Sequence, residues 1–349
     1  MHHLNKLGCR PRRRKPLRNL RVLGGFVGLS LLLGCGSGAD DARIASAGPN
    51  PGQSLVADSV CSTSGFAVQV LGSGGPEITY NDRASSGYLV WVDGAARILI
   101  DAGSGTAANF GRAGAQLEDL LAIGLSHLHV DHSADLPALV KASFFGKRRT
   151  DLPVFGPTGN RVMPATTDYV QALFGKTGAF RYLSGFADSE ASATYHLRPQ
   201  NLEATGRAQF VALTHTLPSD TELRMTAIPV THGPLPALAW RVDLGDHSVT
   251  FSGDMSGARG SLPELAAATD VLIAHNAIPE TAQGGVVGLH MRPSTIGEIA
   301  EQAQPKRLVL SHRMRRALGA EAQTSAAIAQ HYSGPVSYAD DMDCLVIAP

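Results

Sequence analysis

The stretch SHLHVDHSADLP, residues 126–137, places three imidazoles and a carboxylate within six residues: His127, His129, Asp131 and His132. A buried imidazole needs hydrogen-bond partners, and a buried carboxylate needs a cation or a paired charge. A divalent metal ion meets both needs, because it binds imidazole nitrogen and carboxylate oxygen. The stretch therefore predicts a metal site.

The position of this stretch between two predicted elements indicates how its side chains point. LLAIGLS (120–126) is predicted to be a buried strand, and ADLPALVKASFF (134–145) a helix. In extended backbone His127 and His129 point to the same side, which suits one ion. Asp131 and His132 follow as the chain turns, so we expect them to face a second ion.

Further polar residues follow later predicted strands, where additional ligands are expected. They are His232 after ELRMTAIPV (222–230), Asp254 at the end of SVTFSGD (248–254), His275 in DVLIAHN (270–276) and His312 at the end of RLVLSH (307–312).

The chain as a whole has the composition of a large folded domain. It has 349 residues, of which 44% are hydrophobic, enough for a large core. From Phe66 onward predicted strands cluster early and late with helices between them, which predicts an α/β layered sandwich. Residues 176–221 are the least regular part and are predicted to be an inserted loop region.

The N-terminus is typical of an export signal. Residues 1–34 carry eight basic residues and no acid, and their apolar run, 22–33, is too short for a comfortable membrane span. The run ends in LLGC, which resembles the lipobox of bacterial lipoproteins, with Cys35 lipidated. Gly36 rather than Asp after the cysteine favours the outer membrane in that family. A plain secretory signal, with Cys35 incidental, is the alternative.

The predicted organisation is therefore a signal peptide over 1–34, a flexible tether over 35–60 and a folded domain over 61–349, exported to the periplasm and anchored to the outer membrane through Cys35. In that oxidising compartment Cys61 and Cys344 form either a disulfide or two separate buried thiols. Without residues 1–34 the chain has 22 basic and 30 acidic residues, a net charge of −8. This acidity disfavours nucleic acid as a partner.

Four motifs in this order, HLHVDH (127–132), THG (231–233), SGD (252–254) and LSH (310–312), resemble the metallo-β-lactamase hydrolase superfamily. The more similar branch contains ribonuclease Z and the arylsulfatase-like and phosphodiesterase-like enzymes. LGSGGP (71–76) resembles its Gly-rich turn, which would let backbone pass near the metal site. Asp101 matches its supporting carboxylate, whereas Ala239 and Trp240 replace its Gly-Tyr pair. The resemblance implies a four-layer αββα sandwich.

The resemblance also implies a ligand set for two Zn²⁺ ions, with Mn²⁺ or Fe²⁺ as alternatives. His127, His129 and His232 would hold the first ion, Asp131, His132 and His312 the second, and Asp254 would bridge both. A hydroxide shared by the ions would then attack the substrate. The branch's His-Glu-Ala segment reads His275-Asn276-Ala277 here, so we predict His275 as a general acid although the Glu is missing. Asp131 is the second predicted catalytic residue. His290 either caps the following helix or lines the pocket.

The predicted function is hydrolysis of a small anionic ester, a phosphodiester or an aryl sulfate, in the cell envelope. Two alternatives stay open: a lactonase or β-lactamase-like hydrolase, and a non-catalytic metal-binding lipoprotein of the envelope. The expected partners are that substrate, the membrane through Cys35 and, as in many relatives, a second copy of the chain.

Overall fold

The computed structural model describes residue 61, residues 65–78 and residues 83–349. The predictions for the signal peptide, for Cys35 and for the tether lie outside these residues. No helix in the described part of the chain is long and apolar enough to cross a bilayer.

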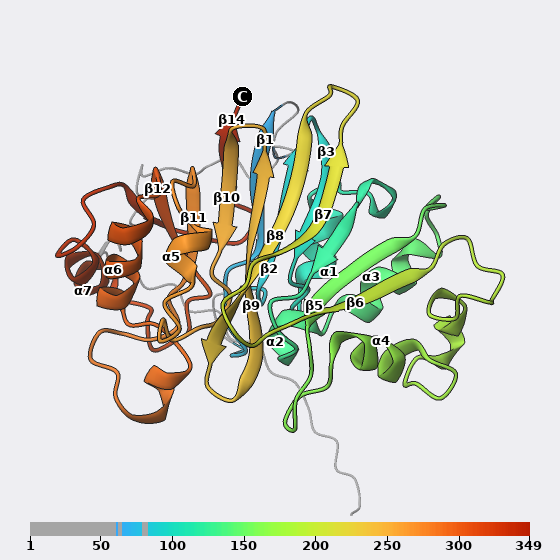
Figure 1. Ribbon diagram of the computed structural model, residues 1–349, viewed down its shortest axis with the longest axis horizontal. Coiled ribbons are helices and arrows are strands. Elements are labelled where there is room, and N and C mark those ends of the chain that lie inside the picture. Colours follow the sequence, from blue (N-terminus) through green and yellow to red (C-terminus); the bar gives the residue numbers. More distant parts are fainter. Residues whose placement is uncertain (1–60, 62–64, 79–82) are drawn as a thin grey trace, which may run out of the picture. The chain divides into compact units, whose positions relative to one another are not determined.

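Two seven-stranded sheets form the centre of the domain (Figure 1). The first has the order β14 (Cys344–Ala348), β1 (Phe66–Gly72), β2 (Gly87–Val92), β3 (Ala95–Ile100), β4 (Ala122–Gly124), β5 (Leu152–Pro157) and β6 (Leu197–Leu202). The second has the order β13 (Val336–Tyr338), β12 (Arg307–Ser311), β11 (Val271–His275), β10 (His247–Phe251), β9 (Leu235–Leu244), β8 (Glu222–His232) and β7 (Phe210–Thr216).

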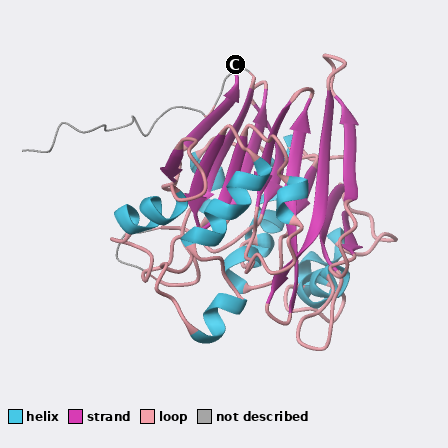
Figure 2. Ribbon diagram, turned by 60° about the vertical axis from the view of Figure 1, so that its left-hand side comes forward, coloured by secondary structure: helices cyan, strands magenta, loops and turns pink. Residues whose placement is uncertain are grey.

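Helices cover the outer face of each sheet, and Figure 2 distinguishes them from the strands by colour. The first sheet packs against α1 (Thr106–Arg112), α3 (Leu136–Ser143) and α4 (Thr166–Phe174), and the short α2 (Val130–Ser133) precedes α3. The second sheet packs against α5 (Leu262–Leu265), α6 (Pro293–Ala303) and α7 (Glu321–Ile328). Shorter 3₁₀ turns cover Leu117–Asp119, Arg181–Phe186 and Gly284–Gly288.

Three separate apolar cores hold these layers together. Strand β1 shows why, because its side chains alternate between two cores. Phe66, Val68 and Val70 face the core between the sheets, whereas Ala67 and Leu71 face the core under the helices of the first sheet. A third core joins the second sheet to α5, α6 and α7. The predicted four-layer αββα sandwich is confirmed.

The prediction of an irregular insertion over residues 176–221 is wrong. This segment contains β6 and β7, each of which is the last strand of its sheet. An edge strand is partly exposed and carries polar side chains, so its sequence lacks the apolar run of a central strand.

Cys61 and Cys344 form a disulfide, with their Cα atoms 5.4 Å apart. Of the two alternatives for these cysteines, the bridge is the one found. It ties the first described residue to β14 across 283 positions of the sequence, and closing so long a loop restricts the unfolded chain.

Breaking this disulfide is expected to destabilise the domain. The double variant Cys61→Ser/Cys344→Ser should lose about 3–5 kcal/mol of unfolding free energy, from the greater entropy of the unlinked chain. Urea denaturation with and without reductant measures this loss. Reductant should lower the wild-type midpoint and leave that of the variant unchanged; a wild-type midpoint insensitive to reductant would contradict the expectation.

Candidate metal centre

The carboxyl ends of strands from both sheets bring the polar residues together. The residues and their strands are His127 and His129 after β4, His232 at the end of β8, Asp254 after β10, His275 at the end of β11 and His312 after β12. Strands β10, β11 and β12 pair in parallel, so their ends lie at the same edge. All these residues except His129 are buried.

Two groups of potential ligand atoms overlap at Asp254. In each group one atom from every residue lies within 4.8 Å of the others. The first group consists of His127, His129, His232 and Asp254, the set expected around the first ion. The second group consists of His132, Asp254, His275 and His312.

Asp131 also lies beside the second group, where it was expected as a ligand. Its Oδ2 atom is 3.2 Å from His312 Nε2 and 3.6 Å from His132 Nε2. Asp254 faces the same two rings, with Oδ1 3.6 Å from His312 Nε2 and Oδ2 3.7 Å from His132 Nε2. Two carboxylates and two imidazoles thus converge on one small space.

Hydrogen bonds of the rings leave nitrogen lone pairs aimed into the centre. His232 Nδ1 donates to the carbonyl of Leu289 (2.8 Å), and its buried Nε2 has no hydrogen-bond partner. His132 Nδ1 donates to Asp101 Oδ2 (2.7 Å), and its Nε2 lies 3.1 Å from Nε2 of His312. Two ring nitrogens this close need a proton or a cation between them. The donor set therefore fits divalent metal ions.

The electrostatics of the cluster favour the metal-binding forms of the two carboxylates and of three imidazoles. Burial lowers the pKa of His127 well below its usual value, and it also lowers the pKa of His129 and His232. At the other two rings burial opposes the charged form, but Asp101 and Asp254 raise the pKa of His132 well above its usual value, and Asp254 raises that of His312. Burial opposes ionisation of Asp254, but the charge of His312 and hydrogen bonds from two further histidines outweigh it and hold the pKa of Asp254 well below its usual range. Against the same opposing burial, a hydrogen bond from His312 lowers the pKa of Asp131 to about 2. Neutral imidazoles and ionised carboxylates are the forms that coordinate metal.

Asp101 supports the centre through hydrogen bonds to His132 and to the start of the histidine-rich stretch, as expected. Its carboxylate accepts hydrogen bonds from the backbone N–H of Ser126 (2.7 Å) and from the hydroxyls of Ser126 (2.9 Å) and Ser86 (3.1 Å), besides that from His132. Its backbone is left-handed, with φ of 60°, which costs a non-glycine residue about 1–2 kcal/mol. His312 has φ of 52°, so two residues of the centre adopt strained backbone that their contacts hold in place.

Removing the charge of Asp101 is expected to weaken metal binding. In Asp101→Asn the amide cannot serve all four donors, so His132 loses its orientation, and the affinity for zinc should fall about 10–100-fold. Competition with a chromophoric chelator measures this affinity. Asp168→Asn, an exposed position on α4, is the matched control, and equal affinities in the two variants would contradict the supporting role.

His275 lies behind Asp254 with both ring nitrogens occupied. Nδ1 donates to Asp254 Oδ1 (2.8 Å), and Nε2 is 3.1 Å from the hydroxyl oxygen of Tyr88, which also lies 2.8 Å from Ser311 Oγ. Burial lowers the pKa of His275 to about 4. The ring therefore has no free nitrogen that could give a proton to a leaving group. Its contacts hold Asp254 in place and do not favour the predicted role of His275 as a general acid. Tyr88, on β2, escaped the sequence analysis.

His290 lies at the centre and does not cap α6. The residue that precedes α6 is Arg292, which makes no side-chain cap. His290 Nδ1 is instead 3.7 Å from Asp254 Oδ2, is buried, and has no hydrogen-bond partner. Burial lowers the pKa of His290 to about 4, so the ring is neutral near pH 7. Of the two alternatives for His290, the helix cap is excluded, and the ring lies at the metal centre.

The glycine-rich turn passes over the centre, as the sequence predicted. A Cβ atom on Gly75 would lie 3.1 Å from His312 Cε1 and 2.9 Å from Met314 Cγ. Any larger residue at position 75 would press on the ring of His312, so glycine permits this close approach.

Comparisons with known proteins agree with this geometry. The family model of the β-lactamase superfamily domain matches residues 96–313. A ribonuclease Z of Mycobacterium sp. (strain KMS) is 29% identical over 294 residues, which are 81% of this chain and 96% of that protein.

Two solved structures share the fold. The metallo-β-lactamase fold protein YhfI from Bacillus subtilis superposes with a TM-score of 0.58 at 22% identity, over 80% of this chain and 98% of YhfI. The short form of human tRNase Z gives a TM-score of 0.59 at 21% identity, over 81% of this chain and all (100%) of that one. The family match spans more than half of the sequence. The chain therefore belongs to the β-lactamase superfamily, and it is a member of the hydrolase family that has the metallo-β-lactamase fold.

Proposed function

We propose that this protein is a hydrolase that uses two zinc ions to cleave phosphodiesters, with aryl sulfates as the second substrate class. The observation that carries the proposal is the position of Asp254, which belongs to both groups of ligand atoms. When bound, the ions would lower the pKa of water and stabilise negative charge on the reacting ester.

The geometry suggests a role for each residue of the centre. His127, His129 and His232 would hold one ion, and Asp131, His132 and His312 the other, with Asp254 between them. The ionised Asp131 would also accept a hydrogen bond from the attacking water. His290, rather than His275, would donate a hydrogen bond from its neutral ring to the leaving oxygen, as a neutral imidazole can do.

The preference for phosphodiesters rests on the relatives, which include ribonuclease Z over nearly their full length. The test is a substrate panel with zinc-loaded protein: bis-p-nitrophenyl phosphate, p-nitrophenyl sulfate, an acyl-homoserine lactone and nitrocefin. Turnover of the phosphate at the highest kcat/KM supports the proposal. A higher value for the lactone or nitrocefin overturns it, and no turnover at all with two ions bound favours the non-catalytic alternative. Metal analysis of protein purified without added metal distinguishes Zn²⁺ from Mn²⁺ and Fe²⁺.

We also propose that the protein acts in the periplasm, anchored to the outer membrane through a lipid on Cys35. The Cys61–Cys344 disulfide supports export, because such bridges persist in oxidising compartments. In Cys35→Ser the lipid cannot be attached, so the protein is expected to move from the membrane to the soluble fraction. Immunoblots of fractionated cells measure this, with Cys9→Ser as the control. A Cys35→Ser protein that stays with the membrane like the wild type would contradict the anchor.

A further inference from the structure

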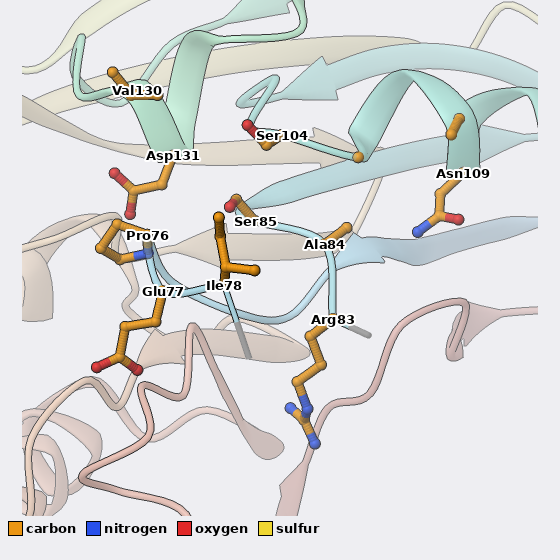
Figure 3. A pocket seen from close by; sticks show the side chains of 12 residues that line it. Pro76, Glu77, Ile78, Arg83, Ala84, Ser85, Ser104, Asn109, Val130 and Asp131 are labelled. Atoms are coloured by element: carbon orange, nitrogen blue, oxygen red, sulfur yellow. The ribbon is translucent and has the colours of Figure 1, made fainter. Parts of the chain in front are cut away.

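A cavity of about 580 Å³ opens beside the metal centre and reaches it at Asp131 (Figure 3). It lies between the turn that follows β1, the start of α1 and the start of α2. We infer that this cavity binds an uncharged, apolar ester group of the substrate, aryl or branched alkyl. The inference rests on the proposed function and narrows its substrate to diesters that carry such a group.

Apolar groups make up the larger part of the surface that lines the cavity. The apolar residues of the described lining are Pro76, Ile78, Ala84, Ala108 and Val130, beside six polar or charged residues. Ile78 is fully exposed and Val130 is 72% exposed, although both lie next to the reacting centre. Figure 3 shows the Ile78 side chain between Asp131 and Ala84. Exposed apolar side chains around a concave site mark a surface that an apolar ligand covers.

Arg83, the one cation among the described lining residues, is already engaged. Its guanidinium pairs with Asp340 and donates to Ser73 Oγ (3.1 Å) and to the carbonyl of Ala339 (3.3 Å). In Figure 3 it points away from Asp131. This arginine is therefore committed to holding the turn against the C-terminal segment.

Three polar side chains that line the cavity are committed in the same way. Asn109 Nδ2 donates to the carbonyl of Leu71 (2.6 Å), and the Ser85 hydroxyl donates to the carbonyl of Gly75 (2.9 Å). The Glu77 carboxylate accepts the backbone N–H of Arg315.

These contacts decide between two kinds of diester. A polynucleotide carries a phosphate on each side of the scissile bond, and binding those phosphates requires unpaired lysine or arginine. The described lining offers none, whereas an aryl group needs only apolar surface and room. The volume lies within the range of roughly 300–1,000 Å³ typical of small-molecule pockets. The cavity thus favours a compact aryl or alkyl diester over RNA.

The test compares substrates that differ only in the group the cavity would hold. Bis-p-nitrophenyl phosphate and methyl p-nitrophenyl phosphate share a leaving group, and thymidine 5′-p-nitrophenyl phosphate adds a nucleoside. Ala108→Phe fills the cavity from the exposed face of α1 and should lower kcat/KM for the bis-aryl diester roughly 10-fold, the size of effect an apolar pocket produces. The methyl diester should change less than about two-fold, since its small group does not depend on the pocket. Ala326→Phe, the same change on the exposed face of α7, is the matched control.

Calorimetric binding of diphenyl phosphate and dimethyl phosphate to the zinc-loaded protein separates this inference from the proposed function. Diphenyl phosphate should bind more tightly than dimethyl phosphate. The Ala108→Phe substitution should weaken the binding of diphenyl phosphate and leave that of dimethyl phosphate unchanged. If the wild type hydrolyses no diester but shows this binding, the function is wrong and the aryl pocket stands. The aryl pocket is overturned if Ala108→Phe affects aryl and methyl ligands equally, or if the wild type has a higher kcat/KM for the thymidine ester than for the bis-aryl diester.

Discussion

Asp254→Ala is expected to abolish turnover and to lower the metal content below two ions per chain. The Asp254 carboxylate reaches both groups of ligands: Oδ2 lies 3.8 Å from His232 Nε2 and 3.7 Å from His132 Nε2, and Oδ1 lies 3.6 Å from His312 Nε2. If two ions are bound as proposed, losing this carboxylate would remove a ligand from each of them and leave positive charge uncompensated. Ions that supply several kcal/mol of transition-state stabilisation correspond to a loss of roughly 10³-fold or more in kcat.

The measurement is kcat on bis-p-nitrophenyl phosphate, together with mass spectrometric metal analysis of the same samples. Asp254→Asn keeps the shape of the side chain and tests whether the charge is what matters. Asp246→Asn, in the exposed turn between β9 and β10, should behave like the wild type. Retention of both ions and of full activity in Asp254→Ala would rule out Asp254 as a ligand shared by the two ions.

His290→Ala is expected to slow hydrolysis most for esters with poor leaving groups. The ring lies beside Asp254, on the loop before α6, and its hydrogen bond would stabilise the charge that grows on the departing oxygen. Removing such a donor costs about 10²–10³-fold in kcat, and p-nitrophenolate needs this stabilisation least. A series of aryl phosphodiesters with leaving groups of rising pKa measures the effect as a steeper dependence of log kcat on leaving-group pKa.

Two control variants make the His290 result specific. His247 is the partly exposed first residue of β10, and His247→Gln should leave the series unchanged. His275→Gln should lower metal affinity, because it disturbs Asp254, but should leave the slope of the series as in the wild type. A slope that steepens in His275→Gln and not in His290→Ala would return the donor role to His275.

Most residues of the centre could be predicted from the sequence because they lie at the ends of strands. His232, Asp254 and His312 each follow an apolar run that can only be a buried strand, so their meeting at one edge was foreseeable. The layered sandwich was foreseeable for the same reason. β6 and β7 were missed, because LRPQNL and FVALTHT are edge strands with exposed, polar positions.

Contacts between distant layers could not be read from the sequence. Tyr88 belongs to the first sheet and His275 to the second, 187 positions apart, and only the packing of the sheets brings them to 3.1 Å. His290 comes from an irregular loop, so no periodicity indicated where its ring would point. The sequence could therefore show neither that Tyr88 occupies the ring of His275 nor that the ring of His290 lies beside Asp254.

Equilibrium titration of the metal-free protein with zinc tests the central claim most directly, with the bound ions counted by mass spectrometry after dialysis. The ligand set around Asp254 predicts two ions per chain in the wild type and fewer than two in Asp254→Ala. Saturation of the wild type at one ion, or at none, would contradict a two-ion centre.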